Sequence, residues 1–311
     1  MVIWATAKDT GWAIQMTLTP EAEFQIDEAL VRALLLSQHP DLAELPIRPL
    51  DAGWDNQMLR LGDELIVRLP RRAVAAQLIV HEQRWLPGLA ARLTLPIPAP
   101  LRIGQPEFGY PWSWSILPYF DGETVDQMSL GDDQAPRLAE FLRALHQPAP
   151  ADAPENPVRG GELSGRIEAF DERVARVRQH TNCFTAELER TWRVALTTEP
   201  AHDRCWLHGD LHARNLLVRD HAILAIIDWG DITAGDVATD LASVWMLLGS
   251  KVARDAALLV YGANETQRAR AMGWAIMFGV MLLDTGLADH PAHEAMGRAT
   301  LARVAQDVEP D

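Results

Sequence analysis

Polar side chains flank an apolar segment in the second half of the chain. Asp210 and Asn215 precede the first of two apolar runs, and Asp228 directly follows the second. The intervening turn at 219–221 predicts that the two runs pair as an antiparallel hairpin. Because the open ends of such a hairpin lie on the same side, these two acids and the amide are expected to converge. Phosphoryl transfer needs such a set, since a carboxylate orients and deprotonates a hydroxyl while oxygen atoms hold Mg²⁺.

The order and spacing of these residues match a known catalytic motif. His-Gly-Asp at 208–210, then Asn215 after four intervening residues, then Asp228 followed by Trp and Gly, resembles the catalytic signature of the aminoglycoside phosphotransferase family. That family is similar to choline kinases and, more remotely, to protein kinases, whose catalytic loop has the same Asp-to-Asn spacing. The resemblance implies that Asp210 accepts the substrate hydroxyl proton and that Asn215 and Asp228 hold Mg²⁺. His208 would brace the loop, and ATP or GTP would donate the phosphoryl group.

The resemblance covers roughly residues 22–304 and implies an α+β, two-lobed protein-kinase-like fold. Its N-lobe would be a small antiparallel sheet, and its C-lobe would be larger and mainly helical. Asp240, in Asp-Leu-Ala, is similar to a downstream aspartate of the family that supports the catalytic loop from a helix start. We expect an N-terminal extension at 1–18, a nucleotide-binding N-lobe at 19–120, and a C-lobe at 121–311 that holds the catalytic loop and the acceptor.

Periodicity and turn signals predict the elements that position these residues. Thr19 as an N-cap with Pro20 behind it indicates a helix start. The turn Gly62-Asp63 joins two predicted strands, and the proline-dense stretch 95–103 is extended or an edge strand at best. A further strand is predicted at 113–118, and helices at 73–89, 135–146, 165–180, 185–197, 268–283 and 293–306.

On the nucleotide side, a kinase-like lobe needs a cation on a strand and a carboxylate on the next helix. Arg68 and Glu82 occupy these places. The family usually has lysine at the first position, so Arg68 departs from its pattern; an arginine fork can bind phosphate and carboxylate together. Arg71 or Arg72 could serve instead.

Two backbone features complete the expected nucleotide site. The turn at Gly53 is a candidate phosphate flap, because glycine permits close backbone approach, although the same residues also form ordinary turns. The stretch 116–120 resembles the hinge that pairs with the adenine edge, around Leu117 and Tyr119. Since Pro118 has no N–H, Tyr119 or its neighbour must supply the donor.

Composition limits the partners. The formal charge of -15, from 43 acidic and 28 basic residues, disfavours nucleic acid and suits a small acceptor that is cationic or bears an amino sugar. Asp231 is the best candidate for acceptor contact. An aminoglycoside-like acceptor is expected, with macrolide, homoserine and choline-like acceptors left open. Other acids could rim the site or serve as caps and solvated residues: Glu265, Asp284, Asp289 and Glu294.

The chain has an ordinary globular composition, with 48% hydrophobic and 23% charged residues. Two cysteines, Cys183 and Cys205, cannot form a disulfide framework, which fits a reducing cytoplasm. No apolar run is expected to reach membrane-spanning length, and the N-terminal residues lack the pattern of a signal peptide. Nothing in the sequence indicates an oligomeric state.

Two other classes of protein remain open from the residues alone. A metal-dependent hydrolase could use His208, Asp210 and His212 as ligands together with Asp228 and Asp231, but this leaves the amide and the N-lobe without a role. A non-catalytic nucleotide-binding module is favoured only by the arginine that stands in place of lysine.

Overall fold

The structure is a computed structural model that describes residues 22–52 and 56–308. It divides into two compact units. We call the first, made of the described residues up to Ala90 and of Pro98–Phe120, the N-unit. The second, made of Ala91–Ile97 and the described residues from Asp121 onward, is the C-unit.

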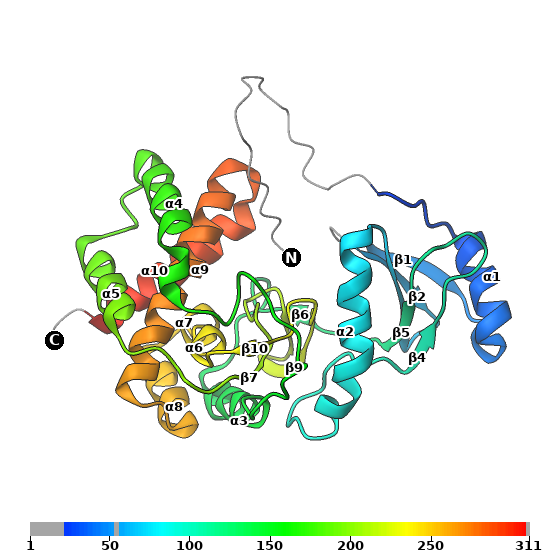
Figure 1. Cartoon of the computed structure of the whole chain (residues 1–311), viewed down its shortest axis with the longest axis horizontal. Helices are drawn as coiled ribbons and strands as arrows, with labels where there is room; N and C mark the ends of the chain where they lie inside the picture. Colours follow the sequence, from blue (N-terminus) through cyan, green and yellow to red (C-terminus); the bar gives the residue numbers. More distant parts are fainter. Residues whose placement is uncertain (1–21, 53–55, 309–311) are drawn as a thin grey trace. The chain divides into compact units, whose positions relative to one another are not determined.

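The N-unit is built on an antiparallel sheet (Figure 1). Its central strand carries a nearly unbroken run of buried residues, because neighbouring strands and a helix leave it little access to water. Gly62, with φ of 61°, makes the tight turn expected between β2 and β3. Helix α2 (Ala73–Ala90) packs against β3 and β5. In spatial order the strands are β1 (Ile47–Ala52), β2 (Asn56–Leu61), β3 (Leu65–Pro70), β5 (Trp114–Pro118) and β4 (Arg102–Gly104).

The first described helix, α1 (Glu28–Gln38), begins later than predicted. The expected cap at Thr19 lies outside the described residues, and residues 22–27 are not helical. Asp27 caps α1 by accepting a hydrogen bond from the Leu30 N–H at 2.8 Å. The preceding segment is held elsewhere, since the Phe24 ring packs edge-on against another aromatic ring of the N-unit. The prediction of one helix running from Thr19 through Leu35 was therefore wrong, because residues 22–27 are not helical and α1 begins at its own cap, Asp27.

The C-unit is mainly helical and contains two small antiparallel sheets. The predicted hairpin is present as β8 (Leu216–Arg219) and β9 (Ala222–Ile226), and β6 (Glu123–Thr124) joins it at β8. Asp220 and His221 both have positive φ, as the favoured two-residue hairpin turn requires. The second sheet pairs β7 (Cys205–Leu207) with β10 (Thr233–Gly235).

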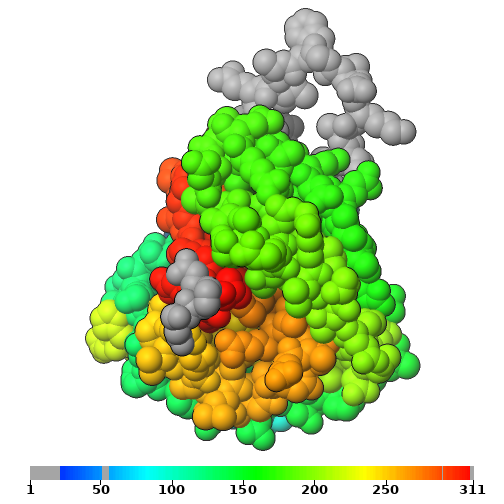
Figure 2. Space-filling view, turned by 90° about the vertical axis from the view of Figure 1, so that its left-hand side faces the viewer, coloured from blue at the N-terminus to red at the C-terminus, as the bar shows by residue number. Residues whose placement is uncertain are grey.

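In the C-unit, α4, α5, α6, α7 and α10 pack against α9 (Glu265–Asp289), whereas α3 and α8 pack against each other. Figure 2 shows parts of α4, α5 and α8–α10 forming one continuous face. Short 3₁₀ turns occur at Pro40–Leu42 in the N-unit and at Asp132–Gln134 and Leu163–Arg166 in the C-unit. The helices are α3 (Ala135–Leu145), α4 (Ile167–His180), α5 (Ala186–Thr197), α6 (Ala238–Leu241), α7 (Ser243–Leu247), α8 (Lys251–Tyr261), α9 (Glu265–Asp289) and α10 (Pro291–Val308).

Helix α9 corrects one expectation from the sequence. Its segment Glu265–Ala288 is long and apolar enough to cross a membrane by length and composition, with a mean hydropathy of 1.5 over its best window. In the fold, however, 78% of that window is buried inside the protein. Trp274, Met277 and Phe278 are each at most 3% exposed, as expected for core residues. The apolar character of α9 is accounted for by its central place among the helices.

A buried ion pair ties α8 to α10 and generates a stability prediction. Arg254 and Asp307 have fully buried side chains and lie 2.6 Å apart. Removing one partner leaves a buried charge without compensation. We therefore expect Arg254→Ala to lower the free energy of unfolding by about 3–5 kcal/mol in urea denaturation. The control Lys251→Ala, which removes an exposed pair with Asp255, should leave it unchanged. A loss below about 1 kcal/mol for Arg254→Ala would contradict this prediction.

Candidate active site

The loop between β7 and β8 carries the predicted catalytic residues on a constrained backbone. Gly209 has φ of 87°, and a Cβ atom there would lie 2.5 Å from the Asp231 carbonyl oxygen. Only glycine allows both the left-handed conformation and this close approach. At the far end of the loop, the Ile227 N–H donates to the Asn215 carbonyl at 2.9 Å. The two open ends of the β8–β9 hairpin are therefore held together, as the spacing predicted.

His208 is fully buried, and both of its ring nitrogens are engaged with the backbone. Because a carbonyl can only accept, Nε2 must donate to the Ile227 carbonyl, which lies 2.9 Å away. Nδ1 then accepts from the Asp210 N–H at 3.2 Å. The ring also packs against Trp229, with 4.7 Å between centroids. A ring held in this way has no nitrogen left for a metal, which removes the main ligand from the hydrolase hypothesis.

Asp240 holds the start of the loop from α6. Its carboxylate accepts hydrogen bonds from the His208 N–H at 2.7 Å and from the Gly209 N–H at 2.9 Å. The His146 ring lies 3.4 Å from the same carboxylate. Burial raises the pKa of Asp240, but the hydrogen bond with His146, the nearby histidines and the backbone donors together lower that pKa below its usual value. The carboxylate is thus ionised and fixed.

Asp210 is also buried, at 6% exposure, and has cationic neighbours. Arg159 donates to its Oδ1 at 2.8 Å, and Nε2 of His212 lies 3.4 Å from its Oδ2. Burial raises the pKa of Asp210, yet Arg159 and then His212 hold the pKa well below the usual range. Asp210 is therefore ionised, which is the form that accepts a proton.

The oxygen donors expected for Mg²⁺ lie at the two ends of the hairpin. Asn215 is buried, and its side-chain Nδ2 donates to the Asp210 carbonyl at 2.8 Å, which leaves Oδ1 as the atom that can bind a cation. Asp228 is exposed and has φ of 58°. One amide oxygen and one carboxylate suit Mg²⁺, which takes few protein ligands and completes its shell with water and phosphate. Among the described residues, no group of three or more His, Cys, Asp or Glu side chains could hold a metal.

Asp231 lies beside the loop, as expected, and is held by a residue that the sequence analysis did not single out. The Asn156 side chain donates to its Oδ1 at 2.7 Å. Burial and then the negative charge of Asp210 raise the pKa of Asp231. Asp231 and Asp210 thus form a close acidic pair whose proton affinities are pushed in opposite directions.

Most of the other acids considered for acceptor contact have other roles. Asp284 is bound by Arg173 at 2.6 Å and by Arg176 at 2.8 Å. Glu294 pairs with Arg298 one helical turn away, at 2.7 Å. Glu265 lies in the first turn of α9, where an acid is favourable. The side chain of Asp289 lies outside the described part of the structure.

A histidine near the loop was not anticipated. His293, in the first turn of α10, has a pKa lowered to about 4, by burial first and then by His290, Arg214 and His212. It is therefore neutral at physiological pH. The neighbours of Asp210 toward α10 therefore include basic and neutral side chains, namely Arg214, His212 and His293.

In the N-unit, Arg68 and Glu82 meet as predicted. The Arg68 side chain donates to the Glu82 carboxylate at 2.8 Å, and the two residues are 6% and 1% exposed. Their elements, β3 and α2, are those that the sequence indicated. The pair places the guanidinium of Arg68 on the central strand, in contact with the acid.

The expected hinge is part of the same sheet. Leu117 is buried and pairs with Ile66 of β3. The Tyr119 N–H donates to the Glu64 carbonyl at 2.7 Å, so this donor is already used within the N-unit. The sequence allowed either Tyr119 or its neighbour to donate an N–H to the adenine edge. Because the Tyr119 N–H is used, the neighbour Phe120 becomes the candidate donor. Gly53, the candidate phosphate flap, lies outside the described residues.

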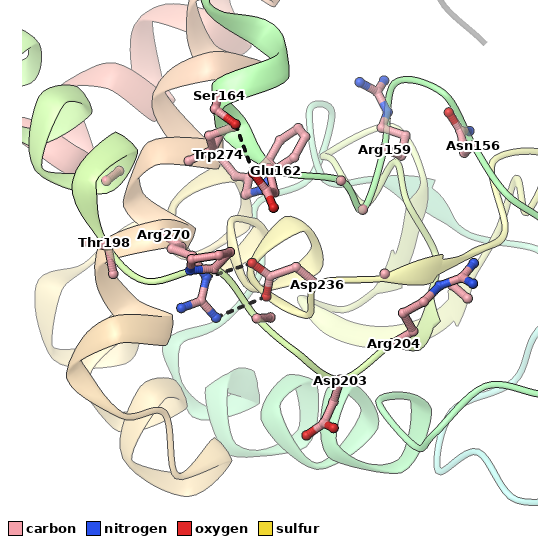
Figure 3. Close-up of a pocket in the computed structure, with 18 of the residues that line it drawn as sticks. Asn156, Arg159, Glu162, Ser164, Thr198, Asp203, Arg204, Asp236, Arg270 and Trp274 are labelled. Atoms are coloured by element: carbon pink, nitrogen blue, oxygen red, sulfur yellow. Dashed lines mark hydrogen bonds and ion pairs between the residues drawn. The ribbon is translucent and has the colours of Figure 1, made fainter.

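A pocket of about 390 Å³ lies in the C-unit, and Asp210 does not line it. Figure 3 shows its wall, where Arg270 binds Asp236 through two nitrogens and Ser164 donates to Glu162. The lining of the pocket includes Asn156 and Arg159, whose side chains also contact Asp231 and Asp210. Two ion pairs lie in its lining, Arg270 with Asp236 and Arg204 with Glu155, so it has the character of a polar groove.

Arg159 and Asn156 are the site residues that the sequence analysis missed. Asn156 lies at the end of the Pro- and Ala-rich stretch 148–157, whose composition is typical of a connector, and Arg159 lies just beyond it. The available signal was Arg159 followed by two glycines: Gly160 has φ of 72°, and its backbone lies against Gly235 so closely that a Cβ on Gly235 would be 2.2 Å from the Gly160 carbonyl oxygen. A glycine pair of this kind indicates tight backbone packing rather than a linker.

A sheet-based unit with a buried Arg–Glu pair, together with a helical unit bearing an Asp–Asn–Asp loop, defines a kinase-like phosphotransferase. Residues 46–274 match the model of the phosphotransferase enzyme family. The match spans most of the chain, which therefore belongs to that family and is a phosphotransferase. No curated protein matches the sequence at a significant level.

Solved structures confirm the predicted fold. The GDP complex of wild-type aminoglycoside 2'-phosphotransferase-IIIa is similar with a TM-score of 0.65 and 18% identity, over 91% of this chain and 100% of the other. The macrolide 2'-phosphotransferase MphH from Brachybacterium faecium has a TM-score of 0.55 and 18% identity, over 88% of this chain and 97% of the other. At such identities the likeness concerns the α+β kinase-like fold.

The contacts of Asp240 generate a prediction with a defined pH dependence. Asp240→Asn puts an amide where two backbone N–H groups need an acceptor, so we expect a loss of about 1–3 kcal/mol in unfolding free energy at pH 7.5. Because the pKa of Asp240 in the folded protein lies below that of an aspartate in an unfolded chain, about 3.9, the contribution of the wild-type carboxylate is complete above that value. It disappears as the pH falls through the folded pKa. Urea denaturation at several pH values should show a constant difference between variant and wild type above about pH 5, and a shrinking difference at more acid pH. A difference that grows toward acid pH would contradict the assignment.

Proposed function

We propose that this chain is a small-molecule kinase that transfers the γ-phosphoryl group of ATP or GTP to a hydroxyl of an aminoglycoside-like acceptor. The observation that carries the proposal is Asp210, a buried and ionised carboxylate on the same loop as Asn215, with Asp228 at the other end of the hairpin. This combination supplies a proton acceptor next to oxygen donors for a cation.

In the proposed reaction, Asp210 orients the acceptor hydroxyl and takes its proton. The acceptor oxygen forms a bond to the γ-phosphorus, and the bond from that phosphorus to the β–γ bridging oxygen breaks. The electron pair leaves with the nucleoside diphosphate, so atoms and charge balance. His208 and Asp240 hold the loop so that the carboxylate does not have to reorganise during transfer.

Asn215 and Asp228 are the residues that would hold Mg²⁺. When bound, the ion supplies positive charge that offsets the charge of the phosphate oxygens. In the N-unit, Arg68 would bind phosphate oxygens of the nucleotide, with Glu82 fixing the guanidinium. A cytoplasmic location, where ATP and GTP are abundant, is part of the proposal.

An amino-sugar acceptor is supported by the similar structures, which include kanamycin, streptomycin and gentamicin complexes of aminoglycoside phosphotransferases. A macrolide acceptor is the second candidate, and a specific observation favours it. Asp284 and Glu294, which could have attracted a polycation, are paired with arginines. A macrolide carries a single amino sugar on a large apolar body and would need fewer acidic contacts.

The assignment of Asp210 yields the central prediction. Asp210→Ala should lower kcat by roughly 10²- to 10⁴-fold while the affinity for Mg·ATP stays close to wild type. The measurement is coupled ADP release over aminoglycosides, macrolides and amino alcohols, with nucleotide binding by isothermal titration. The control is Asp220→Asn in the exposed hairpin turn, because asparagine adopts the positive φ of this position readily.

Two outcomes would contradict the prediction. Near-normal turnover of Asp210→Ala would overturn the assignment of the base, and nucleotide binding by the wild-type protein without transfer to any acceptor would favour the binding-module hypothesis.

The nucleotide side can be tested separately. Removing a charge-assisted contact costs about 1.5–3 kcal/mol, so Arg68→Ala should weaken Mg·ATP binding by roughly 10- to 100-fold. Arg68→Lys, which restores the residue type usual in the family, should recover most of the affinity. Arg48→Ala removes an exposed arginine from β1 of the same sheet and should bind as wild type does. Equal affinities of the Arg68→Ala variant and the wild type would show that another cation binds the phosphates.

A further inference from the structure

The segment 154–160 is attached to β10 along its whole length. The Ala234 N–H and the Thr233 hydroxyl both donate to the Pro154 carbonyl, at 3.1 and 3.0 Å. The Asn156 N–H donates to the Thr233 hydroxyl at 3.0 Å, and the Asp236 N–H donates to the Gly160 carbonyl at 2.8 Å. Because its backbone is fixed at both ends, side chains on this segment have defined positions relative to the catalytic loop.

Two of these side chains reach the acidic pair beside the loop. Asn156 donates to Oδ1 of Asp231 at 2.7 Å, and Arg159, three residues later, donates to Oδ1 of Asp210 at 2.8 Å. One short segment therefore contacts both carboxylates. The two acids repel each other, and the Arg159 guanidinium offsets that repulsion while tying Asp210 to a rigid element.

The surroundings of Arg159 indicate that this contact does more than stabilise the fold. The residue is 4% exposed, and its guanidinium lies over the Phe278 ring, 4.8 Å from the centroid. Its Nε has no hydrogen-bond partner among the described residues. A buried ion pair with an unsatisfied donor contributes little net stability, because desolvation offsets the attraction between the charges. The main effect of the Arg159–Asp210 pair is therefore to fix the orientation of the Asp210 carboxylate.

We propose that Arg159 is a positioning residue for phosphoryl transfer, which holds Oδ1 of Asp210 so that Oδ2 faces the acceptor hydroxyl. This inference rests on the proposed function, in which Asp210 is the base. Oδ2 has the longer contact, 3.4 Å to Nε2 of His212, and that contact can give way to a hydroxyl more easily than the 2.8 Å bond to Arg159.

The step that follows assigns the two carboxylate oxygens different tasks. The acceptor hydroxyl replaces His212 at Oδ2 and passes its proton to that oxygen, while its own oxygen bonds to the γ-phosphorus and the nucleoside diphosphate leaves. Oδ1 stays bound to Arg159 throughout. Without Arg159 the carboxylate can rotate about its Cβ–Cγ bond, so fewer bound complexes have Oδ2 aligned with the hydroxyl.

The test compares Arg159→Gln and Arg159→Lys with wild type. Arg159→Gln keeps a planar, hydrogen-bonding side chain without charge, and we expect kcat to fall roughly 10- to 100-fold with the KM for Mg·ATP unchanged. Arg159→Lys keeps the positive charge without the planar, two-pronged guanidinium and should retain more activity than Arg159→Gln.

A chemical rescue experiment uses Arg159→Ala. Added guanidinium at a non-denaturing concentration should restore part of kcat, an effect that a merely structural role would not give. Melting curves and isothermal titration with Mg·ATP identify the variants that are folded.

The matched control is Arg204→Ala. Arg204 also lies beside the segment and pairs with Glu155 at 3.1 Å, but its contacts are exposed and do not involve Asp210. Its kcat should equal that of wild type. ADP release is measured with kanamycin and with a macrolide, and also with water as the acceptor, so that a readout exists whichever acceptor is used.

The outcomes separate this inference from the proposed function. If Asp210→Ala abolishes ADP release while folded Arg159→Gln retains wild-type kcat, Asp210 is the base and the positioning role of Arg159 is refuted. If Asp210→Ala retains activity, Asp210 is not the base and the positioning role of Arg159 falls with that assignment. If the wild-type protein releases no ADP with any acceptor, the proposed function itself fails. A loss of kcat in Arg159→Ala that guanidinium partly restores, together with a normal Arg204→Ala, supports the positioning role.

Discussion

The candidate site depends on one buried carboxylate that does no chemistry of its own. Asp240 accepts hydrogen bonds from two consecutive backbone N–H groups, at His208 and Gly209, in a part of the C-unit where water cannot substitute for it. Those two bonds set the direction in which the chain leaves β7. Everything downstream, from the position of Asp210 to the closure of the hairpin at Asn215, follows from that direction.

A second constraint is electrostatic. Asp210 and Asp231 are close enough to repel each other, and both are largely buried. Arg159 and Asn156 make the arrangement tolerable, one with charge and the other with a hydrogen bond. The result is a pair of neighbouring acids with different proton affinities, a condition under which one of them can act as a base while the other remains an acceptor or donor of hydrogen bonds.

The sequence was sufficient for the parts of the site whose signals are local. The hairpin and the loop that precedes it were predictable because turn residues and apolar runs determine them. The Arg68–Glu82 pair was predictable because the resemblance implies a cation on a strand and a carboxylate on the next helix, and only these residues had to be placed on those elements. Arg159 was not predictable in this way, since its partner is 51 residues away in the chain and no periodicity links them. The start of α1 was misjudged because Thr19 and Asp27 both have the residue type of a cap, and the sequence does not show that residues 22–27 are non-helical, with Phe24 packed against Tyr110. The acids of α9 and α10 looked available until their arginine partners were located in space.

The arginine at position 68 has a practical consequence. Lysine occurs in this chain only at positions 8 and 251: Lys251 begins α8 in the C-unit, and Lys8 lies outside the described residues. Reagents that acylate primary amines therefore have no target at that pair, because a guanidinium stays protonated and is a poor nucleophile. Amine coupling to a sensor surface should leave this pair chemically intact, and covalent inhibitors designed for a lysine at this position should not react with the arginine that occupies it.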